Sequence, residues 1–235
     1  MKETFVQSEG QCAYCKEILT QKKMSKHLEK HLKEKAIEKT SPNKSFHIRV
    51  EEGPYFLNLL VDANAQLVLL DDFLRAIWLE CCGHMSTLMD KSKKYDFDFD
   101  DDTIGEDMSQ TAKQLFQKGQ KLKYEYDMGS TTRLDITVLE EYSVSALGGI
   151  QILSRNEPLK LLCHLCNEKP AVKMCSIHNW NEPSLFCKSC STKHKKECDD
   201  FADYSAMPIV NSPRMGICGY EGGRIDKKRD AAWKG

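Results

Sequence analysis

Hydrophobic residues recur with two different periods in the middle of the chain. Between residues 70 and 82 they recur at steps of three and four, which predicts an amphipathic helix that ends at Gly83. Alternating apolar and polar residues predict a strand at 46–50 and a hairpin with strands at 122–126 and 134–138 around Gly129, and 55–61 and 85–88 are further strand candidates. Residues 43–156 are therefore predicted to form an α+β domain with an antiparallel sheet.

Paired cysteines and histidines precede this domain. Cys12 and Cys15 are separated by two residues, His27 follows after eleven, and His31 follows His27 after three. The spacing resembles the two-cysteine, two-histidine zinc finger, and the resemblance implies a ββα unit in which a hairpin carries the cysteines and a helix the histidines. Residues 1–40 are predicted to be such a finger with a long basic helix. Gly10 stands where the family normally has an aromatic residue.

The finger helix is the candidate contact for nucleic acid. Nine lysines and only four glutamates lie between residues 16 and 44. By the convention of the finger family, Thr20, Lys23 and Lys26 occupy base-reading positions, and Lys22 lies beside them. The alternative is that this helix is simply a solvated face, because one finger buries too little surface for specific binding.

Four further ligand pairs follow the middle domain. Residues 157–204 contain Cys163 and Cys166, Cys175 and His178, Cys187 and Cys190, and His194 and Cys198. Eight ligands at such spacing predict two zinc ions, so about three are expected per chain. The pattern resembles MYND-like cross-brace fingers, and the analogy implies that the first and third pairs share one ion. The apolar residues between the ligands are predicted to form a small core: Leu165, Val172, Met174, Ile177, Trp180, Leu185 and Phe186.

The predicted hairpin carries a second resemblance. Residues 121–141 read KLKYEYDMGSTTRLDITVLEE, and Tyr124, Tyr126, Asp127 and Gly129 match a motif of the plasmid pRiA4b ORF-3-like family. Four other motif positions differ, at Met128, Ser130, Thr132 and Leu134. The resemblance covers roughly residues 43–154 and implies an α+β domain found in bacteria, archaea and their mobile elements. Tyr126 and Asp127 are candidates for a family site, or for a core tyrosine and a turn-forming aspartate.

Composition narrows the possible functions. No run of eighteen apolar residues occurs, and no secretory leader is recognised, so a soluble protein in the reducing cytoplasm is expected, without membrane contact. Four-ligand zinc sites are structural rather than catalytic, and no small-molecule substrate is indicated. An enzyme stays an alternative only if Cys81, Cys82, His84, His47 and Asp127 converge in space.

Two binding functions are left open by the sequence. In the first, the basic finger binds DNA or RNA. In the second, the zinc modules and the acidic segment 96–107, with seven acidic residues, bind another protein. Residues 205–235, which are punctuated by Gly and Pro and end in a basic stretch, are predicted to be a flexible tail. Cys218, between glycines, is the residue that allows docking of this tail instead.

Overall fold

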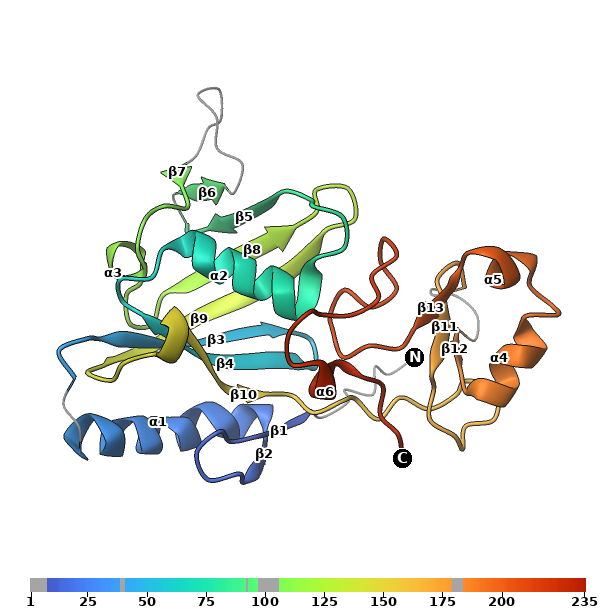
Figure 1. The fold of residues 1–235 in the computed structure, drawn as a ribbon, viewed down its shortest axis with the longest axis horizontal. Helices are drawn as coiled ribbons and strands as arrows, with labels where there is room; N and C mark the ends of the chain where they lie inside the picture. The colour runs from blue at the N-terminus through green and yellow to red at the C-terminus, as the bar shows by residue number, and fades with distance from the viewer. Residues whose placement is uncertain (1–7, 39–40, 92, 97–105, 179–183) are drawn as a thin grey trace. The chain divides into compact units, whose positions relative to one another are not determined.

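The computed structural model describes residues 8–38, 41–91, 93–96, 106–178 and 184–235. The chain divides into two compact units, one made of Met1–Arg75 and Gly83–Glu157 and the other of Ala76–Cys82 and Pro158–Gly235. The expected α+β class is confirmed, because the first unit is built on an eight-stranded, mostly antiparallel sheet flanked by helices (Figure 1). Within the described ranges, every helix is too short or too polar to cross a membrane.

The sheet has the strand order β10-β4-β3-β9-β8-β5-β6-β7. Its strands are β3 (Ser45–Glu52), β4 (Tyr55–Asp62), β5 (Ser86–Met89), β6 (Lys94–Asp96), β7 (Glu106–Asp107), β8 (Lys121–Tyr126), β9 (Thr132–Tyr142) and β10 (Ile150–Arg155). Strand β4 is buried along almost its whole length because both faces of the sheet are covered there, whereas β8 alternates buried and exposed residues. The strands predicted from alternation are confirmed.

Helix α1 (Gln21–Glu38) packs on the sheet. It follows the hairpin of β1 (Glu9–Gln11) and β2 (Ile18–Thr20). Its buried residues share one hydrophobic cluster with residues of β4, β9 and β10: Cys12, Met24, Leu28, Leu32, Phe56, Leu60, Tyr142, Ala146 and Leu153. The predicted finger therefore shares a hydrophobic core with the middle domain.

Helix α2 (Leu67–Leu74) covers the opposite face. It begins three residues before the predicted start and continues as a π-helical turn, Arg75–Leu79. Asp71 is buried in the second turn and pairs with Arg75 at 2.6 Å. The same carboxylate accepts hydrogen bonds from Ser86 and Tyr124. Burial raises the pKa of Tyr124 well above its usual value, and the Asp71 carboxylate raises it further. A short helix, α3 (Ala112–Leu115), follows β7.

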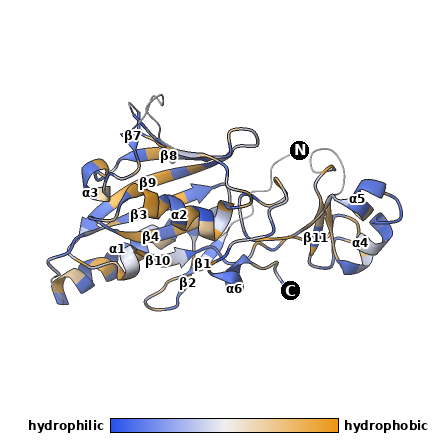
Figure 2. Ribbon diagram, turned by 45° about the horizontal axis from the view of Figure 1, so that its top comes forward, coloured by the Kyte–Doolittle hydropathy of each residue, from blue (hydrophilic) through white to orange (hydrophobic). Residues whose placement is uncertain are grey.

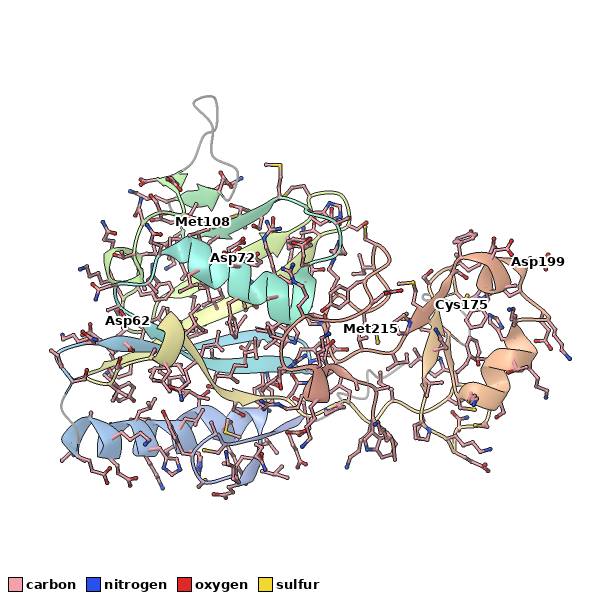
Figure 3. The ribbon with its side chains drawn as sticks, in the orientation of Figure 1. Asp62, Asp72, Met108, Cys175, Asp199 and Met215 are labelled. Carbon is pink, nitrogen blue, oxygen red and sulfur yellow. The ribbon has the colours of Figure 1, made fainter. Side chains whose placement is uncertain are left out.

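The second unit is small and rich in loops. Strands β11 (Lys173–Cys175), β12 (Leu185–Phe186) and β13 (Ala206–Pro208) form a sheet in the order β12-β11-β13, with helices α4 (Lys188–His194), α5 (Asp199–Asp203) and α6 (Lys227–Asp230). The three helices are mainly hydrophilic (Figure 2). Figure 3 labels Cys175, the last residue of β11, and Asp199, the first of α5. Because β13 pairs with β11, the module extends past residue 204, and the segment predicted to be a flexible tail is part of the fold.

Candidate metal centres

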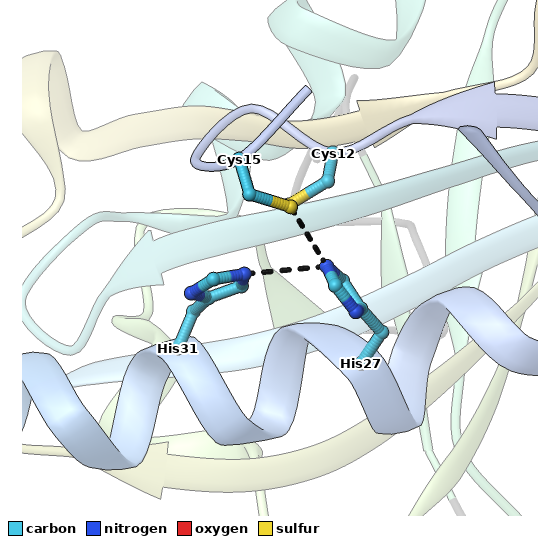
Figure 4. Close-up of side chains that lie close together, drawn as sticks. All are labelled: Cys12, Cys15, His27 and His31. Atoms are coloured by element: carbon cyan, nitrogen blue, oxygen red, sulfur yellow. Dashed lines mark hydrogen bonds between the residues drawn. The ribbon is translucent and has the colours of Figure 1, made fainter. Parts of the chain in front are cut away.

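The first group of metal-binding side chains joins the N-terminal hairpin to α1. Cys12 and Cys15 lie in the turn between β1 and β2, and His27 and His31 are one helical turn apart on α1 (Figure 4). Cys15 Sγ lies 3.2 Å from His27 Nε2, which lies 3.2 Å from His31 Nε2. The structure thus brings together the four ligands predicted from spacing, in an arrangement that can hold a metal ion.

Two glutamates lie beside the histidines of this group. Glu17 Oε2 lies 3.6 Å from His27 Nδ1, and Glu34 Oε2 lies 3.8 Å from His31 Nδ1. A carboxylate on Nδ1 favours the tautomer that leaves Nε2 free as a ligand, which is the common outer arrangement of metal-bound histidines. The buried side of the group is apolar, and burial raises the pKa of the Cys12 thiol. Metal binding there must release a proton.

The C-terminal module contains two groups whose ligands interleave along the chain. Cys163, Cys166, Cys187 and Cys190 form one group, and Cys175, His178, His194 and Cys198 form the other. The first pair thus lies with the third and the second with the fourth, as the cross-brace analogy implied. Cys166 Sγ and Cys187 Sγ are 4.0 Å apart, and both groups can hold a metal ion.

Local contacts prepare these ligands for metal. A hydrogen bond from the Ser189 hydroxyl is the largest of several that lower the pKa of Cys187 to about 6, so this thiol is ionised near neutral pH, the form that binds metal. His194 stacks on Phe186 with ring centroids 4.3 Å apart and meets Phe201 edge to face. These aromatic rings fix the imidazole plane and shield one side of the second group.

The core predicted for this module is only partly correct. Met174 and Phe186 are buried, but Leu165, Val172 and Ile177 are exposed by 40% or more. The reason is that each ligand side chain points inward, so its neighbours in the tight turns point to solvent. Trp180, also assigned to the core, lies outside the described residues.

A fourth group was not predicted as a metal site. Cys81, Cys82 and Cys218 lie together in the second unit. With them, each of the eleven cysteines belongs to a group that could hold a metal ion. The signal in the sequence was the number of cysteines, because three of them did not belong to any predicted zinc group. Cys218 is 136 residues from Cys82, so no spacing pattern connects them.

The structure also describes the residues predicted to contact nucleic acid and those of the candidate family site. Lys22, Lys23 and Lys26 are exposed on α1, while Thr20 at the end of β2 is half-buried. Tyr126 is fully buried, and Asp127 Oδ1 accepts hydrogen bonds from the Gly129 and Ser130 amides at 2.9 and 3.1 Å. A core tyrosine and a turn-forming aspartate are therefore confirmed.

His47 does not join any of these groups. The ring is buried, and Nε2 donates to Asn58 Oδ1 at 2.9 Å. Burial lowers the pKa of His47 to about 4. The set of residues that an enzyme would have required is therefore incomplete, because Cys81 and Cys82 lie together without the His47 imidazole.

Comparisons with known proteins add little to this geometry. No family model matches the chain, and no curated protein matches it. A crystal structure of the protein of unknown function MM3350 from Methanosarcina mazei Go1 is similar in part, with a TM-score of 0.37 and 13% identity. The similarity covers 43% of this chain and 61% of that one. At this level it carries no argument, and the metal-binding groups rest on the residues of this chain.

Proposed function

We propose that this protein is a non-enzymatic zinc protein that binds nucleic acid through the lysine-rich face of α1. Zinc is supported by the spacing of the ligand atoms. With bond lengths of about 2.3 Å to sulfur and about 2.0 Å to nitrogen, a tetrahedral zinc ion places two ligands roughly 3.3–3.8 Å apart. The separations in the N-terminal group, 3.2 Å, and between Cys166 and Cys187, 4.0 Å, lie close to this range.

The ligand number supports a structural role for these ions. Each of the three predicted groups offers four protein ligands, so a tetrahedral ion has no open position for a water or substrate. The eight thiols in these three groups also suit a reducing compartment, and we place the protein in the cytoplasm. The resemblance of residues 43–154 to the plasmid pRiA4b ORF-3-like family is the reason to associate it with bacterial mobile elements.

The observation that carries nucleic-acid binding is the division of α1 into two faces. Met24, Leu28 and Leu32 are fully buried against the sheet. Gln21 donates to Glu51 at 3.1 Å and Ser25 to Asn58 at 2.9 Å, so the start of the helix is also tied to the sheet. The opposite face is held rigidly toward solvent, and rigid presentation lowers the entropy cost of binding.

That solvent face is basic. Lys22, Lys23, Lys26 and Lys30 are exposed, and no ion pair joins them to a described acidic residue within 4.0 Å, whereas Lys33 is paired with Glu29 at 2.5 Å. Unpaired lysines along one helix face suit the regularly spaced phosphates of a duplex. Because the helix is fixed to the sheet, we expect contact with the backbone rather than deep insertion into the major groove, and hence little sequence preference.

A salt series tests this proposal. Zinc-loaded protein is titrated onto random-sequence duplex DNA, and affinity is measured between about 50 and 200 mM salt. Four phosphate contacts predict a slope of log K on log salt of roughly −3 to −4, with a Kd in the micromolar range at low salt. The triple variant Lys22→Ala, Lys23→Ala, Lys26→Ala should flatten the slope to about −1.

The matched control removes the same charge elsewhere. Lys91, Lys94 and Lys121 are exposed lysines of the first unit, outside α1. Their triple alanine variant should keep the wild-type slope. Equal weakening of DNA affinity in both variants would show that binding depends only on net charge, and absence of binding at low salt would refute the proposal.

A protein-binding function has its own support in the second unit. Leu165 and Ile177, each between two ligands of a tight turn, are 47% and 43% exposed, and Tyr204 is 69% exposed. Exposed apolar residues on a metal-held scaffold suit contact with another protein. The acidic segment assigned to this function lies mostly outside the described residues, at 97–105. If DNA binding fails, the variant Leu165→Ser, Ile177→Ser, tested for loss of partners from cell extract, is the next experiment.

A further inference from the structure

The three cysteines outside the predicted sets are positioned as ligands. Cys81 and Cys82 follow the π-helical turn that ends at Leu79, and Cys218 lies in the C-terminal segment. The Sγ atoms of Cys81 and Cys82 are 3.7 Å apart, as are those of Cys82 and Cys218. A disulfide requires about 2.05 Å, whereas two sulfurs on one tetrahedral zinc ion are roughly 3.8 Å apart.

The C-terminal segment is held in place on both sides of Cys218. Before it, the Ser212 hydroxyl donates to the carbonyl of Trp78 at 2.7 Å. After it, the amide of Arg224 donates to the carbonyl of Ala76 at 2.7 Å. Cys218 is therefore carried by a loop anchored at two points to the turn that precedes Cys81 and Cys82. This anchoring presents its thiol to the other two.

Glycine and a buried arginine secure this contact. A Cβ at Gly223 would lie 2.4 Å from the carbonyl oxygen of Ile77, so only glycine permits the close approach. Arg214 is fully buried, and its guanidinium donates to Cys81 Sγ at 3.5 Å. Three thiolates and a dication carry a net negative charge, which a neighbouring arginine offsets.

We propose that Cys81, Cys82 and Cys218 bind a fourth zinc ion. Three cysteine thiolates are a common part of structural zinc ligand sets. This site goes beyond the three predicted ions and beyond nucleic-acid binding. It joins a helix end to a segment 136 residues further along the chain. An ion that closes a loop of this length should stabilise the fold more than one that closes a short loop.

The test is a zinc count on the full chain. Protein purified with zinc under reducing conditions is dialysed against a weak chelator, and bound zinc is measured by elemental analysis. Wild type should hold four ions and Cys218→Ser three, while Cys218→His, which restores a ligand, should hold four. His164→Gln, which removes a histidine outside every group, should leave the count at four.

The outcomes separate the fourth site from the others. Three ions in wild type would overturn the proposal even if Cys218→Ser failed to fold, and four in Cys218→Ser would place the fourth ion elsewhere.

Discussion

Gly10 is the point at which the N-terminal hairpin touches the sheet. It forms a bridge with Asn156, directly after β10, and the amide of Ala13 donates to the carbonyl of Leu153 at 2.8 Å. A Cβ at this position would lie 2.5 Å from the carbonyl oxygen of Arg155 and 2.8 Å from Phe56 Cζ. Because β10 is paired with β4, that carbonyl cannot withdraw, and the hairpin has to move instead.

We therefore expect Gly10→Ala to destabilise the first unit. Overpacking of this kind costs about 1–3 kcal/mol, which lowers Tm by roughly 2–10 °C for a domain of this size. The hairpin also carries Cys12 and Cys15, so the N-terminal group should bind zinc more weakly. Thermal unfolding of the zinc-loaded protein, followed by circular dichroism, measures the first effect, and chelator competition measures the second.

Two controls make the result decisive. Gly129→Ala places a Cβ 3.4 Å from Asp127 Oδ1, an ordinary contact, and should change stability by less than about 0.5 kcal/mol. Gly10→Phe introduces the aromatic residue that a free finger of the resembled family would have, and should be worse than alanine. An unchanged Tm for Gly10→Ala, or stabilisation by Gly10→Phe, would show that the sheet leaves room for a side chain at position 10 of the hairpin.

Three further predictions concern the core of the first unit. Leu28→Ala should cost about 2–5 kcal/mol in urea unfolding, while Ile37→Ala, at an 83% exposed position of the same helix, should be neutral. Asp71→Asn should cost about 3–5 kcal/mol because it leaves the buried Arg75 without its counter-ion. His47 has a pKa of about 4 when folded and about 6.5 when unfolded, so its contribution is complete above pH 6.5 and is lost as the pH falls to 4, about 3 kcal/mol in all.

Controls for the last two predictions lie close by in the chain. Asp72→Asn, next to Asp71 but exposed, should be near neutral, and an equal loss at both positions would contradict the assigned role of the buried pair. For His47, the stability of wild type and His47→Gln is compared between pH 7 and 4.5. Acid release of zinc acts on both proteins, so their difference isolates the imidazole, and parallel pH profiles would contradict the depressed pKa.

The sequence predicted what depends on neighbouring residues. Strand alternation, the Gly129 turn and the ligand pairs are all local patterns, and the structure contains each of them. The ligand sets could be predicted because metal ligands often lie in tight turns or on one helix face, where the spacing in the sequence determines the spacing in space. Contacts between distant segments have no such spacing, so a single sequence does not reveal them.

The burial of α1 and the fourth group show what was missed. Lysines dominate α1 by number, so it was predicted to be a finger helix, and it was not predicted that Leu28 and Leu32 join the core under the sheet. Cys218 meets Cys82 only after 136 residues, and its approach depends on a buried arginine and on glycine at position 223. Neither feature is periodic, so no pattern in the sequence marks them.

The bridge from Gly10 to Asn156, just after the last strand of the unit, has a consequence during synthesis. As the chain leaves the ribosome, Cys12 and Cys15 appear long before Leu153 and Asn156, the residues on which their hairpin rests. Until then the N-terminal ligands lack the sheet that covers them, and contacts so distant in sequence form slowly. The nascent chain therefore exposes reactive thiols for most of its translation, and early zinc capture by this hairpin would protect them from oxidation until the sheet closes.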